Sequence, residues 1–534
     1  MSSPQIKFFA KRYVLVSLCI FLSVNATQAQ STAGKEFWFG FMENFTFTQD
    51  SLWVYICSDR NTSGTLEIPL AGFLQNFSVN ANSYVKFYIP NYIGMNDTSE
   101  QIEYKGIHII SADTILVSCL NQHDADTDGS SVIPKAMLGN EYSALSYKFN
   151  SFSWSEFLIV SADSNTILQI IPADTTAAGL LPQTLSVVLL QSGESYQVQS
   201  HGDLTGSTVS ANKPFAFFSG HQITSVPNEC CEDHLFEQML PAGKWATMYI
   251  TTPLKSRSYG DTYRILAKED STNIYLNGVL IHSLNQNQFS EDTITNNPFS
   301  SITLPAVLTS NKQFAVGQYA NGTNYDLTDS DPFLLQLWPF SLAYNKTVFQ
   351  THPSQNSNPF NYYVNIVAKN TAVTSVKFNG SFLSSSLFVN VNGSDYSYAS
   401  LIIPYGTHVI ESDSAFLAYH YAFVYTESYG YTLTGYKYDT PTSTNQLSNK
   451  QFEINIYPNP FKEFATVQLP YSPVNTKGFT FSLFDVSGKK VYCHDEIHTV
   501  KFEINRENLG NGVYFYMLGD EKNNTLAKGK VVAY

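Results

Sequence analysis

Short runs of aromatic and β-branched residues recur between residues 34 and 438, and the 3.6-residue period of an amphipathic helix is almost absent. Four of these runs resemble one another: Leu52–Asp59, Phe157–Asp163, Tyr263–Glu269 and Tyr363–Lys369. Phe, Tyr, Val, Ile and Thr suit the pleated, half-buried surface of a sheet, and short apolar runs have the length of strands. The pattern therefore predicts an all-β fold.

The four runs start about 100 residues apart, and each is followed by a second short strand and later by a more apolar one. This order indicates a four-fold quasi-repeat, with repeats near residues 34–150, 151–255, 256–350 and 351–438. Six or seven strands in each repeat favour tandem units that resemble β-sandwiches. A propeller-like array would repeat in the same way and stays open as the alternative.

A polar stretch at residues 439–450 separates the repeats from a different pattern at Gln451–Tyr534. The stretch cannot bury enough apolar surface to offset its ordering entropy, so it is expected to be a linker. Beyond it, Ala465–Leu469 and Phe479–Leu483 alternate apolar and polar residues, and Gly488 and Gly512 occupy expected hairpin turns. The tail is therefore predicted to be a small Ig-like β-sandwich.

The residues of this tail resemble the type A C-terminal sorting domain of the Bacteroidota type IX secretion system. The resemblance rests on an opening motif, two turn motifs and a closing motif, which contribute Tyr457, Pro458, Asn459, Pro460, Gly488, Gly512, Lys528, Gly529 and Lys530. It implies that the type IX machinery exports the protein and that a sortase-like protease removes the tail near the linker. The mature protein is then expected to be secreted or attached to the outer-membrane surface.

The beginning of the chain agrees with export. Three basic residues, Lys7, Lys11 and Arg12, precede a short apolar run and small residues, which predicts a signal peptide at residues 1–29 with cleavage between Ala29 and Gln30. Its removal changes the formal net charge from −14 to −17. An acidic chain argues against nucleic-acid binding, which needs basic patches. No later run is long enough to predict a transmembrane segment in the mature chain.

A second resemblance covers about residues 34–430, which look like the N-terminal domain of IgG-Fc-binding proteins. It rests on Gly34–Asn44 and on the segment Cys230–Pro241, which departs from the family pattern by the extra residue Glu232 and by Ala242 in place of a second proline. The resemblance implies a binding or adhesion role, with an unknown extracellular protein or glycan as the ligand.

The export route permits disulfide bonds. Cys57, Cys119, Cys230 and Cys231 are the candidates, and three pairings among them stay open. A zinc site built on Cys230, Cys231 and His234 is less favourable, because adjacent cysteines are awkward tetrahedral ligands. Cys493, in the tail, is expected to be an unpaired, partly buried thiol.

Asp124, Asp126 and Asp128 have the spacing of a calcium-binding loop. However, Lys135 stands where a bidentate glutamate would complete the site, and no helical pattern flanks the loop. A solvated turn held by Asx hydrogen bonds is the alternative interpretation. Apart from weak calcium binding, the sequence predicts no cofactor.

No catalytic motif for nucleophilic, zinc-hydrolase, phosphate or dinucleotide chemistry occurs in the chain, so we expect no enzyme. Among 34 tyrosines, a group near the end of the repeats is expected to be partly exposed and to suit recognition: Tyr396, Tyr398, Tyr405, Tyr425, Tyr429, Tyr431, Tyr436 and Tyr438. The sequence thus favours a secreted binding or adhesion protein. A secreted carbohydrate-active hydrolase and a structural component of a surface layer or matrix are the alternatives.

Overall fold

The chain divides into two compact units, residues 1–439 and residues 440–534. The computed structural model describes residues 32–45, 51–123, 125–148, 152–227, 231–257, 259–293, 305–326, 328–354, 359–424, 426–438, 454–469, 478–506, 509–520 and 525–534. Signal-peptide residues 1–29, Gln30 and the expected linker at 439–450 lie outside these ranges.

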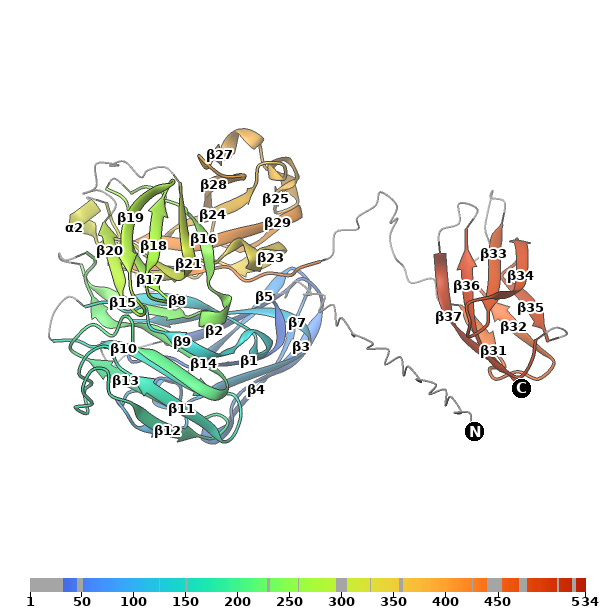
Figure 1. Cartoon of the computed structure of the whole chain (residues 1–534), viewed down its shortest axis with the longest axis horizontal. Coiled ribbons are helices and arrows are strands. Elements are labelled where there is room, and N and C mark those ends of the chain that lie inside the picture. Colours follow the sequence, from blue (N-terminus) through green and yellow to red (C-terminus); the bar gives the residue numbers. More distant parts are fainter. Residues whose placement is uncertain are drawn as a thin grey trace, which may run out of the picture. The chain divides into compact units, whose positions relative to one another are not determined.

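The first unit contains four sheet systems, which follow one another along the chain from blue to orange in Figure 1. We call them repeats 1 to 4. Repeat 1 consists of β1 (Gly34–Phe39), β2 (Ser51–Ser58), β3 (Thr62–Ile68), β4 (Phe73–Val79), β5 (Ser83–Ile89), β7 (Ile107–Gln122) and β8 (Thr127–Val132). Repeat 2 consists of β9 (Gly139–Ser143), β10 (Ser155–Ser161), β11 (Thr166–Ile171), β12 (Ser186–Leu190), β13 (Ser195–Ser200), β14 (Thr208–Thr224) and β15 (Asp233–Gln238), and is joined by β6 (Ile102–Glu103).

The last two repeats follow the same plan. Repeat 3 consists of β16 (Ala246–Thr251), β17 (Thr262–Ala267), β18 (Thr272–Leu276), β19 (Val279–Leu284), β20 (Phe289–Thr293), β21 (Ala306–Tyr319) and β22 (Leu334–Gln336). Repeat 4 consists of β23 (Tyr344–Gln350), β24 (Asn361–Lys369), β25 (Lys377–Phe378), β26 (Ser381–Phe382), β27 (Val389–Asn390), β28 (Tyr396–Ile403), β29 (Thr407–Val424) and β30 (Glu427–Thr432).

Helices in the described ranges are single turns. They are η1 (Pro69–Ala71), α1 (Asn91–Gly94), η2 (Lys135–Met137), η3 (Ala242–Lys244), α2 (Thr323–Asp326), η4 (Phe340–Leu342), η5 (Val373–Ser375) and η6 (Ser385–Leu387). Three of them, η2, η3 and η4, follow a proline and connect one repeat to the next.

Each repeat is organised around one long strand: β7, β14, β21 or β29. The first half of this strand pairs with the first strand of its repeat, and the second half pairs with the last strand. The pairing with the first strand is irregular near the middle of every long strand. Each repeat is therefore a pair of sheets that share one strand, which confirms the predicted all-β fold of sandwich-like units.

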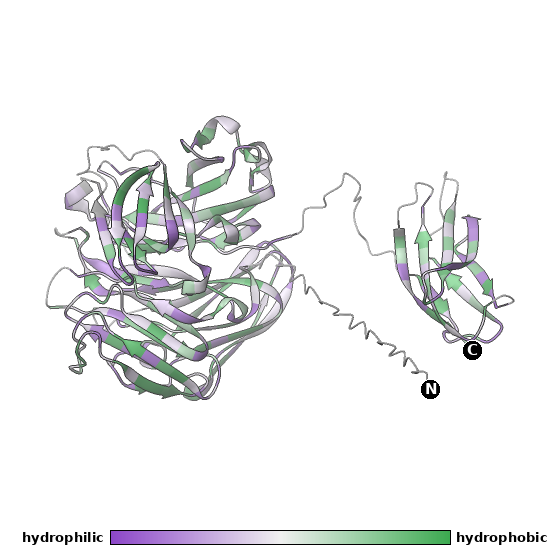
Figure 2. Cartoon of the chain, viewed as in Figure 1, coloured by the Kyte–Doolittle hydropathy of each residue, from purple (hydrophilic) through white to green (hydrophobic). Residues whose placement is uncertain are grey.

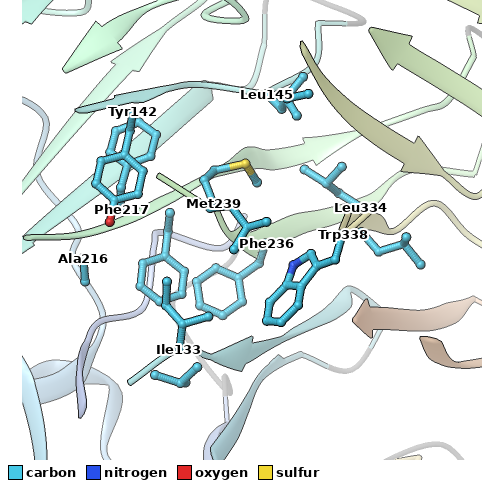
Figure 3. Close-up of a cluster of buried hydrophobic side chains, with 14 of the residues drawn as sticks. Ile133, Tyr142, Leu145, Ala216, Phe217, Phe236, Met239, Leu334 and Trp338 are labelled. Atoms are coloured by element: carbon cyan, nitrogen blue, oxygen red, sulfur yellow. The ribbon is translucent and has the colours of Figure 1, made fainter. Parts of the chain in front are cut away.

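The four repeats also form a closed ring. The last strands contact one another in order, β8 with β15, β15 with β22, β22 with β30, and β30 again with β8. Apolar side chains from all four repeats join one buried cluster, in which Ile133, Phe236 and Trp338 lie close together (Figure 3). Apolar and polar positions alternate along many of the strands (Figure 2).

The boundaries between repeats differ from those expected. The sheets of repeats 2, 3 and 4 begin with β9, β16 and β23, at Gly139, Ala246 and Tyr344, earlier than residues 151, 256 and 351. The strand that follows each junction proline pairs with a long strand many residues later, as β9 does with β14. Local hydrophobic patterns carry no information about such distant pairing.

The second unit has a three-stranded and a four-stranded sheet around its own core. The smaller sheet consists of β31 (Asn455–Tyr457), β32 (Phe464–Gln468) and β35 (Lys501–Asn505). The larger consists of β33 (Phe479–Phe484), β34 (Lys490–Ile497), β36 (Gly512–Gly519) and β37 (Thr525–Ala533). Phe481, Leu483 and Val467 are fully buried between them, as expected for a small β-sandwich.

Candidate functional site

One carboxylate joins all four repeats at the centre of the ring. Asp128, on β8, accepts hydrogen bonds from the backbone N–H groups of Gly129 (2.7 Å), Phe236 (2.9 Å), Leu334 (3.1 Å) and Gly430 (3.3 Å). These four donors come from β8, β15, β22 and β30. Burial raises the pKa of Asp128, and the four N–H donors act in the opposite direction. The side chain is thus a structural link between repeats.

This geometry bears on the expected calcium loop. Both oxygens of Asp128 are occupied by backbone donors, and Asp124 lies outside the described residues. Burial raises the pKa of Asp126 to about 7, and its carboxylate lies 3.7 Å from the ring of His123. In the described ranges, no three His, Cys, Asp or Glu side chains form a group suited to a metal ion. Calcium binding stays a prediction.

Two of the four disulfide candidates are buried free thiols. Cys57 lies on β2 opposite Leu116, whereas Cys119 lies on β7 opposite Val54. Of the three pairings left open by the sequence, a bond between Cys57 and Cys119 is not formed in this structure, because the two residues occupy different register positions. Burial raises the pKa of Cys57 to about 12. Cys230 lies outside the described residues, so a pairing of Cys230 with Cys231 stays a prediction, as does zinc binding there.

In the tail, Cys493 is a free thiol, but it is exposed rather than partly buried.

The tyrosines expected at the surface differ in exposure. Tyr396 and Tyr398 are half-buried, and Tyr425 lies outside the described residues. Tyr429, Tyr431 and Tyr436 are at most 2% exposed, because the strand face that carries them packs against neighbouring strands. Tyr405 and Tyr438 are 54% and 38% exposed. Alternation along a strand predicts two faces, but it does not show which of them another repeat will cover.

A partly exposed aromatic surface lies at the border of repeats 1 and 4, where Tyr88 and Tyr405 are exposed and Trp53 and Tyr84 are half-buried. We define the aromatic platform as Trp53 on β2, Tyr84, Lys86 and Tyr88 on β5, and Tyr405 from repeat 4. The side chains at positions 84, 86 and 88 share one face of β5, since successive side chains of a strand alternate. Trp53 is the cross-strand partner of Tyr88, with ring centroids 5.6 Å apart.

Neighbouring groups hold the platform in place. The ammonium group of Lys86 lies 4.5 Å from the centroid of the Trp53 ring, a cation–π contact. Tyr55, on the same face of β2 as Trp53, is buried, and its ring centroid lies 6.1 Å from that of Tyr84 and 4.0 Å from that of His352. Rings fixed in this way lose little entropy when a ligand covers them. The alternation of aromatic and basic residues along β5 was visible in the sequence, but its exposure was not.

The opening and turn motifs of the tail lie at strand ends and turns, whereas Lys528, Gly529 and Lys530 of the closing motif lie within β37. The side chain of Asn459 accepts a hydrogen bond from the N–H of Val532 (2.9 Å) and donates one to the carbonyl of Lys530 (3.3 Å), so the opening motif is fastened to the closing one. Gly488 has a φ of +83°, which favours glycine in this turn. Gly529 faces the ring of Tyr516, where a Cβ atom would lie 2.5 Å from the hydroxyl oxygen.

Comparison with known proteins explains both parts of the chain. A family model described as "IgGFc binding protein" matches residues 128–422, which is more than half of the sequence. The chain belongs to this family. A second model, "Secretion system C-terminal sorting domain", matches residues 455–532. Both predicted resemblances are thereby confirmed, and the sorting domain marks a protein that is secreted or attached to the cell surface.

Among individual proteins, the human IgGFc-binding protein is 26% identical over 293 residues, which cover 54% of this chain and 5% of the human protein. The crystal structure of dimeric latent PorU from Porphyromonas gingivalis is 8% identical and covers 56% of this chain and 35% of that one, with a TM-score of 0.13. The eight N-terminal Ig domains of the Down Syndrome Cell Adhesion Molecule are also 8% identical, cover 94% of this chain and 69% of that one, and give a TM-score of 0.13. These two structural likenesses are too weak to bear on the fold.

The family match does not include the whole platform. Trp53, Tyr84, Lys86 and Tyr88 precede the matched residues 128–422, and Tyr405 lies within them.

Within the described ranges, no helix has both the length and the apolar character needed to cross a membrane.

Proposed function

We propose that this protein is an extracellular binding or adhesion protein that holds a protein or glycan ligand on the aromatic platform. The observation that supports the proposal most directly is that two exposed tyrosines adjoin two half-buried aromatic rings and a lysine, in a family of binding proteins. Tyr88 is 48% exposed and Tyr405 is 54% exposed. Large side chains left in water at adjoining positions commonly mark an interaction surface.

The chemistry of the platform suits recognition better than catalysis. Tyr and Trp provide a large contact area at small entropic cost, and their polar atoms can still form hydrogen bonds to a ligand. Lys86 adds one positive charge, which would favour a ligand that carries acidic groups. The two matching families are named for binding and sorting, which also favours a role without catalysis.

The decisive experiment is a glycan and host-protein binding array with the full-length protein, repeated with Trp53→Ala and Tyr88→Ala. Loss of a central aromatic anchor typically costs about 2 kcal/mol of binding free energy, which weakens affinity about 30-fold. Tyr104→Ala is the matched control, because this tyrosine is 57% exposed but does not belong to the platform. Ligands retained equally by all three variants would contradict the proposal.

The two alternative functions give different results. Turnover of a polysaccharide by the purified protein would favour a carbohydrate-active hydrolase. Self-assembly in light scattering, without any ligand, would favour a structural component of a surface layer or matrix.

We further infer that a sortase-like protease cuts the chain in residues 439–450, which begin at the boundary of the two compact units. The sorting domain supports handling by the type IX machinery, whereas the cut itself is part of this proposal. Mass spectrometry of the protein recovered from culture medium tests it. A mature C-terminus before Gln451 is expected, and a secreted protein that retains Tyr534 would contradict it.

A further inference from the structure

A pocket of about 430 Å³ lies at the junction of repeats 3 and 4, and none of its lining residues belongs to the aromatic platform. Its lining includes Thr247 on β16, Phe340 and Ser341 in η4, Lys369 at the end of β24, Tyr396 at the start of β28, and Lys437 after β30. Pockets that bind small ligands commonly have volumes of roughly 300–1,000 Å³. The space is therefore large enough for one or two sugar rings.

The two lysines of this pocket are not paired with acidic groups of the protein. Within the described residues, neither Lys369 nor Lys437 forms an ion pair or a side-chain hydrogen bond. The acidic residues next to the lining in sequence, Asp395 and Asp413, make no ion pair with them either. Two ammonium groups without an ion-pair partner in one pocket, on a chain with a formal net charge of −14, favour an anionic ligand.

The corresponding junctions between the other repeats are occupied by protein groups. At the first junction, Lys135 in η2 lies 3.1 Å from both Glu36 and Asp163. At the second junction, the ammonium group of Lys268 donates hydrogen bonds to the carbonyl of Ala242 (3.1 Å) and to the side chain of Gln313 (3.0 Å). Both lysines are thus engaged by neighbouring groups of the protein.

The third junction replaces these contacts with an aromatic wall. Phe340 follows the junction proline, at the position that Lys135 occupies at the first junction. The ring centroid of Phe340 lies 4.5 Å from that of Tyr396. Strand β24 of repeat 4 corresponds to β17 of repeat 3. Lys369 is the last residue of β24, and Lys268 follows directly after β17. The sequence change therefore leaves a lysine without a partner beside two half-buried rings.

We propose that this pocket binds a carboxylated sugar residue of an extracellular glycan. Lys369 and Lys437 would bind the carboxylate, and the apolar C–H face of the sugar would pack on Phe340 and Tyr396. Hydroxyl groups of Thr247 and Ser341 are available for hydrogen bonds to the ring hydroxyls. A simple inorganic anion would not use the rings, and a purely apolar ligand would not use the lysines. The proposal rests on the binding function proposed above and assigns it a second site.

The test is calorimetric titration of the full-length protein with digalacturonate, and with maltose as the neutral disaccharide. We expect digalacturonate to bind at least about tenfold more tightly than maltose, because a charge-assisted contact is worth about one order of magnitude in affinity. Lys369→Gln and Lys437→Gln should each weaken binding about tenfold. Lys148→Gln is the matched control, since this lysine is exposed and does not line the pocket, and it should leave affinity unchanged.

Several results would overturn the proposal. They are the absence of saturable digalacturonate binding at millimolar concentration, equal affinities for the two disaccharides, and unchanged binding by the Lys369→Gln, Lys437→Gln double variant. Tighter binding of a tetraglutamate peptide than of digalacturonate would show that the pocket recognises acidic peptides. Thermal unfolding of each variant separates lost binding from lost folding.

Variants of the platform distinguish this proposal from the previous one. Trp53→Ala should leave digalacturonate binding unchanged if the pocket is a separate site. An array ligand that depends on Trp53, together with no digalacturonate binding, would sustain the proposed function and overturn the pocket assignment. Digalacturonate binding without any platform-dependent ligand would sustain the pocket assignment and overturn the proposed role of the platform.

Discussion

A pair of buried carboxyl groups between repeats 1 and 2 should make the protein less stable as pH rises. Glu43 follows β1 and Glu156 lies on β10, and they are 6% and 0% exposed. The side-chain amide of Gln199 donates hydrogen bonds to both, at 2.6 Å and 2.9 Å. Burial raises the pKa of Glu43 to about 7, the hydrogen bond from Gln199 opposes this, and the charges of Asp97 and Glu103 add to it.

The sign and size of the effect follow from proton linkage. The ordinary pKa of this carboxyl group is 4.5, so between pH 4.5 and about 7 the folded protein holds a proton that the unfolded chain releases. Folding is therefore favoured less as pH rises through this window, and the loss is complete above pH 7. The difference between the two pKa values corresponds to about 3 kcal/mol of unfolding free energy. Burial also raises the pKa of Glu156, so this partner acts in the same direction.

The perturbation is Glu43→Gln, which keeps an acceptor for Gln199 and removes the titrating group. At pH 8 we expect the variant to be more stable than the natural protein by up to about 3 kcal/mol, with little difference at pH 4.5. For a unit of roughly 400 residues, this corresponds to a rise in Tm of about 3–4 °C.

Differential scanning calorimetry between pH 4.5 and 8 measures the effect, with Glu141→Gln, an exposed carboxylate on β9, as the control. A Glu43→Gln variant that is no more stable than the natural protein at pH 8 would refute the reasoning.

Three further predictions concern the ring centre, the thiols and the tail. Asp128→Asn should lower the unfolding free energy by about 2–5 kcal/mol, because an amide N–H₂ would face backbone donors and leave buried N–H groups without an acceptor. Urea denaturation measures this loss, and an unchanged midpoint would contradict the prediction. Cys57→Ala should change the unfolding free energy by less than about 2 kcal/mol, and equally with or without reductant, since the thiol is free. A loss of stability on adding reductant that is seen only in the natural protein would indicate a disulfide. Deletion of residues 451–534 should retain the protein in the periplasm while the ring stays folded, as judged by fractionation and by protease resistance, and equal surface display with and without the tail would contradict the sorting role.

The sequence alone determined the features that depend on local pattern. The strands, their four-fold recurrence and the sorting motif were all predicted, because alternation, turn glycines and motif residues act over a few neighbouring positions. The family relationship was also recognisable from short motifs and is confirmed by the match to residues 128–422.

The tertiary structure decided everything that depends on which surfaces meet. Closure of the ring brings backbone donors from all four repeats to Asp128, although Gly430 lies 302 positions after Asp128 in the chain. It buries Tyr429 and Tyr431 and leaves Tyr88 in water, three tyrosines that strand periodicity does not distinguish. Lys369 and Lys437 share a pocket only because β24 and the end of the ring come together there. The physical reason is that periodicity specifies two faces for each strand, whereas contacts between distant strands decide which face is covered.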